Sequence, residues 1–200
     1  MAWTQLLHLG DSALTIPAGG AIAAWLLAGR AWRAALGWSL VFALALGLVA
    51  ATKIAFMGWA TGVPALDFKA LSGHATGFAA VCPTLCYLAT RGQGHAARAL
   101  PVAAALVLSG VVAAALVHAG EHTVAEAAAG WLTGTAAFLA AVHLTGNTPV
   151  PPPGRAFACA LLAFLVMARV VHGAPLGWWM IKAALVLSGN TATTPWHHCG

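Results

Sequence analysis

The pair His122 and Glu126 combines the residue types of a nucleophile and an orienting carboxylate. The two residues are four apart, so they share one face of a helix that begins near residue 121, where the carboxylate can orient and polarise the imidazole. Hydrolases use an imidazole held in this way as a nucleophile or a general base. The spacing therefore predicts that His122 attacks a substrate and that Glu126 steadies it.

A second histidine, His74, follows Ser72 and Gly73 at the expected start of another helix. The first turn of a helix has backbone N–H groups without intrahelical acceptors, and these groups bind anions. A phosphate would fit at this position, and His74 would be placed to protonate a leaving oxygen. We therefore expect Ser72 and Gly73 to contact a phosphate and His74 to act as the general acid.

The chain around these residues is apolar. Of its 200 residues, 61% are hydrophobic and only 6% are charged, compared with roughly 25% charged residues in an average soluble domain. The net charge of +5 comes from scattered residues and not from the basic run of a nucleic-acid-binding protein. The four cysteines form no CxxC pair and indicate neither a disulfide framework nor a zinc site. The composition predicts an integral membrane protein, in which ionisable residues are candidates for function.

Six apolar stretches, each bounded by polar, glycine or proline residues, have the length of membrane spans. They run over residues 13–28, 34–56, 73–90, 100–118, 124–144 and 156–173. We expect an all-α bundle of six transmembrane helices that forms a single domain over residues 1–200, with its core at about 12–174. Residues 175–200 are expected to form a tail and an interfacial helix along the membrane surface, because Trp178 and Trp179 suit such a position.

The arginines set the expected orientation. They occur in the connections between spans 1 and 2, 3 and 4, and 5 and 6, which share one side of the membrane. The positive-inside rule makes this side cytoplasmic. These residues are Arg30, Arg33, Arg91, Arg98 and Arg155. His74 and His122 then lie on the opposite side, and we expect a multi-pass protein of the cell (inner) membrane whose site faces the periplasm or the exterior.

Three motifs resemble those of the type 2 phosphatidic acid phosphatase family, whose superfamily includes the vanadium haloperoxidases. The family pattern has a lysine followed by Arg-Pro, a PSGH element and an SR-x5-H-x3-D element, which meet across several helices. Here Lys53 is similar to the lysine, Ser72, Gly73 and His74 form an LSGH element, and the stretch HTVAEAAAGWLTG begins at His122. The chain resembles a divergent bacterial member over six helices, and hence over most of its length.

The resemblance implies roles for the matched residues. In this family the histidine of the third element attacks phosphorus and forms a phosphohistidine, its acidic partner steadies it, and the histidine of the second element is the general acid. Carried over, these roles belong to His122, Glu126 and His74, and Lys53 would bind the phosphate. The family reaction needs no metal and no cofactor, so the resemblance implies neither.

Two arginines of the family pattern are replaced in this chain. Leu116 stands at the position of the third-element arginine, and no Arg-Pro follows the family lysine at the usual spacing. Three other cations are candidates to bind the substrate phosphate: Lys69 before the SGH element, His118 one helical turn before the nucleophile, and Arg169 in the last span. Arg169 is the most suitable by chemistry, because a guanidinium matches phosphate oxygens.

The expected function is that of a membrane lipid phosphatase, a hydrolase of lipid metabolism. Its substrate would be a lipid phosphate or diphosphate such as undecaprenyl diphosphate, phosphatidylglycerophosphate or phosphatidic acid. The expected partner is this membrane lipid and not a nucleic acid. The alternatives are a lipid phosphotransferase, a non-catalytic lipid-binding or transport protein that kept the fold, and a b-type haem protein with paired axial histidines.

Overall fold

The chain is helical, as its apolar periodicity predicts. The computed structural model describes residues 8–146, 148 and 153–196. Its helices are α2 (Ser12–Ala28), α3 (Trp32–Trp59), α4 (Gly73–Ala89), α5 (His95–His118), α6 (Val124–Thr145), α7 (Pro153–His172) and α8 (Leu176–Ser188), with the short 3-10 helices η1 (His8–Gly10) and η2 (Pro64–Leu66). Within the described residues, strand-like pairing is limited to an isolated bridge between Val63 and Phe68. The predicted all-α fold is confirmed.

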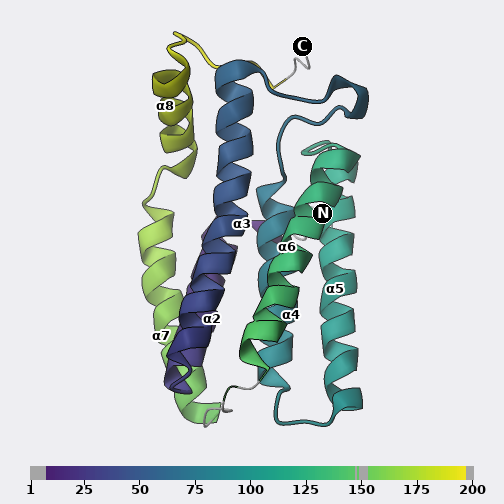
Figure 1. Ribbon diagram of the computed structural model, residues 1–200, viewed down its shortest axis with the longest axis vertical. Helices are drawn as coiled ribbons and strands as arrows, with labels where there is room; N and C mark the ends of the chain where they lie inside the picture. Colours follow the sequence, from purple (N-terminus) through teal and green to yellow (C-terminus); the bar gives the residue numbers. More distant parts are fainter. Residues whose placement is uncertain (1–7, 147, 149–152, 197–200) are drawn as a thin grey trace.

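Successive helices from α2 to α7 run in alternating directions along the long axis of the molecule (Figure 1). The α2–α3 connection, the α4–α5 connection and the start of α7 lie at the same end, the lower end of the view. These segments contain the arginines that were expected on one side of the membrane. The fold therefore gathers the basic residues at one end of the bundle, and most of the candidate site residues lie nearer the other end.

Four helices are long and apolar enough to cross a membrane: α3, α5, α6 and the segment Gly154–His172 of α7. The expected first and third spans correspond to α2 and α4, which have 17 residues each. That length is at the lower limit of the usual range of about 17–25 residues. The chain is thus a multi-pass helical membrane protein with four candidate spans by length and composition, where six were expected.

The C-terminal helix α8 follows α7 after a break that contains Pro175. We expected it to lie along the membrane surface, but it runs beside the upper part of α3 (Figure 1). Gly58 of α3 has no side chain, so Ala184 and Ser188 of α8 can approach its backbone closely. This contact buries Ala184 completely. Helix packing therefore sets the direction of α8, in addition to the preference of its tryptophans for an interface.

The α2–α3 contact is organised around Trp38, which is completely buried. Its indole stacks on Phe42 with ring centroids 5.2 Å apart, and its Nε1 donates a hydrogen bond to the Gly19 carbonyl of α2 at 2.9 Å. Burial of two aromatic rings with the indole N–H satisfied is a strongly stabilising arrangement. It fixes α2, and with it the N-terminal end of α2, relative to α3.

Two glycines of α6 allow a close approach to α4. A Cβ atom at Gly130 would lie 2.6 Å from the Ser72 carbonyl oxygen, and one at Gly134 would collide with the Thr76 carbonyl oxygen. Small residues at helix contacts let backbones approach in this way in membrane proteins. The contact brings the N-terminal ends of α4 and α6 together, so the segments that carry the two predicted catalytic histidines meet.

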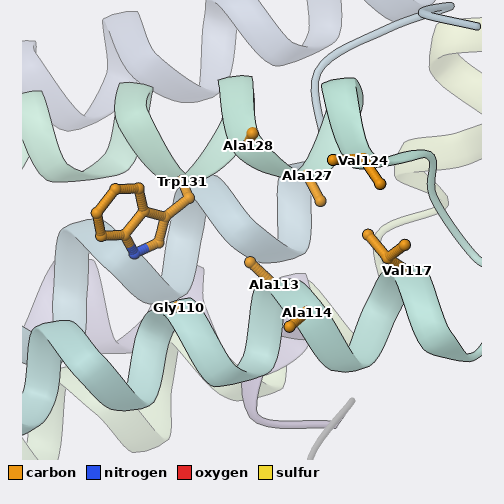
Figure 2. A pocket seen from close by; sticks show the side chains of 8 residues that line it. All are labelled: Gly110, Ala113, Ala114, Val117, Val124, Ala127, Ala128 and Trp131. Carbon is orange, nitrogen blue, oxygen red and sulfur yellow. The ribbon is translucent and has the colours of Figure 1, made fainter.

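The outer contact between α5 and α6 is a shallow apolar groove of small residues (Figure 2). Trp131 forms one end of it, and its Nε1 donates a hydrogen bond to Ser109 Oγ at 2.9 Å. The remaining lining residues are Gly110, Ala113, Ala114, Val117, Val124, Ala127 and Ala128. The groove is lined by no ionisable side chain, so it is a packing surface and not a candidate for chemistry.

Candidate active site

His122 lies in the turn between α5 and α6 and is held by the first turn of α6. Thr123 is the N-cap residue, and its hydroxyl accepts a hydrogen bond from the Glu126 amide at 3.3 Å. The Glu126 carboxylate accepts hydrogen bonds from the Thr123 amide at 3.2 Å and from His122 Nδ1 at 3.0 Å. The predicted contact is present. It arises from a capping box and not from a shared helical face, because α6 begins at Val124, after His122.

The Glu126 carboxylate also joins α6 to the loop before α4. Its second oxygen, Oε1, accepts hydrogen bonds from the amides of Lys69 at 3.0 Å and Ala70 at 3.4 Å. The Ser72 amide donates to the Glu126 carbonyl at 3.3 Å. Glu126 is only 4% exposed, and a buried carboxylate requires such donors. One side chain therefore orients His122 and positions the segment that leads to His74.

His74 lies in the first turn of α4, as predicted. Ser72 is the N-cap residue, and its hydroxyl accepts a hydrogen bond from the Ala75 amide at 3.3 Å. Gly73 and His74 are the first two residues of the helix, so their N–H groups have no acceptor within it. The positive end of the helix dipole lies at the same place. This turn can therefore hold an anion beside the His74 imidazole.

Ionisable residues from three segments act on His74: the start of α2, helix α3 and the turn between α5 and α6. His74 interacts electrostatically with Asp11, His122, Lys53 and Glu121. The 3-10 helix η1 packs directly on it, because a Cβ atom at Gly10 would lie only 2.8 Å from the His74 Cβ. The two histidines that were predicted to cooperate are therefore neighbours, and the start of α2 belongs to the same site.

Asp11 is the acidic residue that we did not expect at the site. It is the N-cap residue of α2, and its carboxylate accepts a hydrogen bond from the Ala13 amide at 2.9 Å. An Asp-Ser pair before an apolar stretch is typical of a helix start, and this signal was present in the sequence. The sequence did not show that α2 begins beside His74, because that depends on how α2 packs on α4. Asp11 supplies His74 with a nearby carboxylate.

Lys53 lies on α3 and faces the same region. It interacts electrostatically with His74 and Glu126. The preceding residue, Thr52, fixes this turn of α3 to the loop before α4, because its hydroxyl accepts a hydrogen bond from the Leu71 amide at 3.2 Å. The predicted phosphate-binding lysine thus lines the same cavity as His74 and is in electrostatic range of Glu126.

The other three predicted cations lie outside the cavity that Lys53 and His74 line. Lys69 Nζ forms an ion pair with Asp67 at 3.2 Å. His118 is the exposed last residue of α5, and Arg169 is exposed on α7. Contact of these side chains with a bound phosphate therefore requires them to turn towards the site, and this role stays a prediction for each of them.

A cavity of about 530 Å³ opens beside His74 between α2, α3, α4 and α8. This volume is within the range of about 300–1,000 Å³ for small-molecule sites. Its polar residues are Ser12, Thr15, Lys53, Gly73 and His74, and the rest of its lining is apolar apart from the indole N–H of one tryptophan. A ligand with an anionic group and an apolar body matches this combination of a few polar residues with a mostly apolar lining.

The hydrogen bond to Glu126 fixes the tautomer of His122. A carboxylate only accepts hydrogen bonds, so Nδ1 carries a proton, and in the neutral imidazole Nε2 is the nitrogen with the free lone pair. In this form the imidazole can attack an electrophile or accept a proton. His74 is a second imidazole that can donate and accept a proton, and Lys53 favours an anionic substrate. The arrangement can carry out nucleophilic substitution on an anion such as a phosphate.

Among the described residues, no group of three His, Cys, Asp or Glu side chains is arranged to hold a metal ion. Cys82, Cys86 and Cys159 are free thiols. None of the three cysteines lines the cavity beside His74. The functional groups of the site are its two histidines, the nearby carboxylates and Lys53.

A curated relative is similar to most of this chain. The chain is 32% identical over 152 residues to the "Uncharacterized 22.5 kDa protein in cps region" of Klebsiella pneumoniae, an alignment that covers 76% of this chain and 73% of the relative. No family model and no solved structure matches the chain. On this identity and coverage, the chain belongs to the same family as the 22.5 kDa protein of the Klebsiella pneumoniae cps region.

Proposed function

We propose that this protein is a membrane lipid phosphatase that resembles the type 2 phosphatidic acid phosphatases. The observation that carries the proposal is the contact of His122 Nδ1 with Glu126 at 3.0 Å, in electrostatic range of His74 at the N-terminal end of α4. The contact supports a role for His122 as a nucleophile, and the position of His74 at a helix start supports roles for it as a proton donor and for its helix as an anion site. Phosphoryl transfer needs these three components.

The proposed reaction has two steps. In the first, Nε2 of His122 attacks phosphorus, the bond from phosphorus to the lipid oxygen breaks, and the leaving oxygen takes a proton from His74. In the second, water attacks the phosphohistidine, His74 takes the water proton, and inorganic phosphate leaves. Glu126 stabilises the positive charge that the His122 ring carries in the intermediate. If another lipid replaces water in the second step, the same site is a lipid phosphotransferase.

Lys53 and the first-turn amides of α4 are the proposed holders of the phosphate. A lysine can pair with phosphate as a point charge, and backbone N–H groups at a helix start add directional donors. Lys69, His118 and Arg169 are further candidates. If Arg169 binds the phosphate, Arg169→Ala should lower turnover at least tenfold. Near-normal turnover of this variant would mean that Lys53 and the amides bind the phosphate without Arg169.

We further propose that α2 to α7 all cross the membrane and that the two histidines face the periplasm or the exterior. The alternating helix directions support six crossings (Figure 1), and the arginines at one end support a cytoplasmic assignment of that end. The cell (inner) membrane is the proposed location, and α8 is proposed to lie near the extracytoplasmic interface. Candidate substrates are lipids with an outward-facing phosphate, such as undecaprenyl diphosphate, phosphatidylglycerophosphate or phosphatidic acid.

The second candidate function is that of a lipid-binding or transport protein without catalysis. The specific observation in its favour is Leu116, which stands where the resemblance leads one to expect an arginine. Its side chain is 1% exposed and belongs to an apolar cluster with Phe78 and Val112. That position therefore supplies no charge for a phosphate. A protein with fewer cations can still bind an anionic lipid through Lys53 while it turns over slowly or not at all.

Phosphate release from a panel of lipid phosphates in detergent separates the two functions. We expect release by the wild type, inhibition by vanadate, which mimics the trigonal bipyramidal transition state, and loss of release in His122→Ala. His143→Ala is the matched control, because His143 is exposed in the last turn of α6, at the other end of that helix. Equal inactivity of the wild type and His122→Ala across the panel would exclude the phosphatase.

A further inference from the structure

The cavity beside His74 extends away from the histidines between α3 and α8. Its polar end contains Lys53 and His74. Beyond them the wall is formed largely by Val49 and Ile54 of α3 and by Met180 and Ala183 of α8. The cavity thus continues from the proposed phosphate site into an apolar space that has α8 as its outer wall.

Helix α8 is fixed to α3 at its C-terminal end. Asn190 Nδ2 donates a hydrogen bond to the Gly58 carbonyl at 2.6 Å, and the Thr194 amide donates to the Met57 carbonyl at 2.9 Å. At this end Gly58 lets the two helices touch, since Ser188 Cβ would lie 3.3 Å from an added Cβ atom. The cavity-lining residues of α8 all precede this contact. The cavity therefore lies between the two helices on the site side of this contact, and we call this space the wedge.

The exposed surface of α8 is largely apolar, and its one charged residue, Lys182, lies over the Trp178 ring at 4.8 Å. Trp178, Ile181, Val186 and Leu187 are large apolar residues that are exposed. In a membrane protein such side chains contact lipid chains. In a membrane the wedge between α3 and α8 would therefore adjoin hydrocarbon on its outer side, and on its inner side it is lined by Lys53 and His74.

We propose that this wedge binds the hydrocarbon chain of the lipid phosphate, with the phosphate at Lys53 and His74, and that α8 is the element that selects the chain. This inference rests on the proposed function for the identity of the headgroup. A hydrocarbon chain is the occupant that matches the apolar lining, the adjoining lipid and the cation at one end. Met180 and Ala183 are two of the α8 residues that line the space, together with Leu176, Gly177 and Trp179.

The chain site is tested by photolabelling of the full-length protein in detergent. The probe is a long-chain alkyl phosphate with a diazirine in the middle of the chain, and the labelled residues are mapped by mass spectrometry. We expect labels on α8 at or next to Met180 and Ala183, and at least tenfold weaker labelling there in Ala183→Phe, in which a ring fills the wedge. Val186→Phe is the matched control, because Val186 lies on the same helix with its side chain 73% exposed.

Label distributed evenly over the lipid-facing helices, or equal labelling of wild type and Ala183→Phe, would overturn the proposal. Phosphate release measured in parallel separates it from the proposed function. With an active enzyme, Ala183→Phe should lose at least tenfold in turnover of long-chain phosphates and keep that of a short, water-soluble alkyl phosphate. Labels on α8 without phosphate release from either substrate would support the chain site and contradict the phosphatase.

Discussion

Replacement of Glu126 by glutamine removes the charge that orients His122 and changes little in size. The carboxylate accepts hydrogen bonds at Oε2 from His122 and the Thr123 amide, and at Oε1 from the amides of Lys69 and Ala70. A glutamine has one oxygen, so its NH₂ group must replace one of these two acceptors. The orientation of the glutamine amide decides the effect on His122.

The two orientations differ in the number of backbone donors that they leave without an acceptor. An NH₂ group at the Oε1 position faces two amides, whereas at the Oε2 position it faces the Thr123 amide and His122. Each buried donor without a partner costs about 1–3 kcal/mol, so the second orientation is favoured. It donates to His122 Nδ1 and moves the ring proton to Nε2, the atom that must attack. The analogous wrong-tautomer substitution in a serine protease triad lowers turnover by about 10⁴-fold.

We therefore expect Glu126→Gln to lose about 1–3 kcal/mol of stability and roughly 10²- to 10⁴-fold in lipid phosphate turnover. Turnover is measured by phosphate release, stability by thermal unfolding in detergent, and the tautomer by ¹⁵N NMR of the labelled histidine. Glu121→Gln is the matched control for the tautomer: Glu121 is exposed and outside the capping box, so its neutralisation removes a charge near His74 but should leave the His122 tautomer unchanged. A folded Glu126→Gln protein with turnover within tenfold of wild type would refute the assignment.

Two further substitutions test the phosphate site and the fold. Lys53→Met keeps the length of the side chain and removes its charge, so we expect at least a tenfold loss in kcat/KM for lipid phosphates. Lys53→Arg restores a positive charge and should recover part of this loss. Unchanged kinetics in Lys53→Met would exclude a role of Lys53 in phosphate binding. Gly134→Ala places a methyl group against the Thr76 carbonyl oxygen, and we expect it to destabilise the protein by about 1–3 kcal/mol, measured by thermal unfolding. Gly92→Ala, which meets nothing within 4 Å, should leave stability nearly unchanged.

The parts of the structure that depend on neighbouring residues in the chain were predictable. The expected spans agree with α2 to α7 to within a few residues, except that α3, α5 and α7 begin earlier than expected. The His122–Glu126 contact was predicted from a spacing of four, although the local structure is a capping box. The contact is therefore as predicted, but His122 precedes α6 and does not share a helical face with Glu126.

The parts that depend on packing between distant segments were not predictable. Asp11 reaches the site because η1 packs on His74, and a single sequence carries no signal for that contact. The cavity wall formed by α8 depends on Gly58 and on the hydrogen bond from Asn190, which lies 132 residues further along the chain. The positive charge of Lys69 indicated a residue near the site but did not establish contact with a phosphate. In the structure Lys69 forms an ion pair with Asp67 on the loop before α4.

The most direct test of the central claim, that His122 is the nucleophile, is to trap the covalent intermediate. Purified protein is mixed with a lipid phosphate labelled with ³²P, quenched within a turnover, and digested for mass spectrometry. The account predicts an acid-labile, base-stable phosphohistidine at His122 that is absent from His122→Ala. Rapid phosphate release by the wild type without any label at His122, or with the label on another residue, would contradict it.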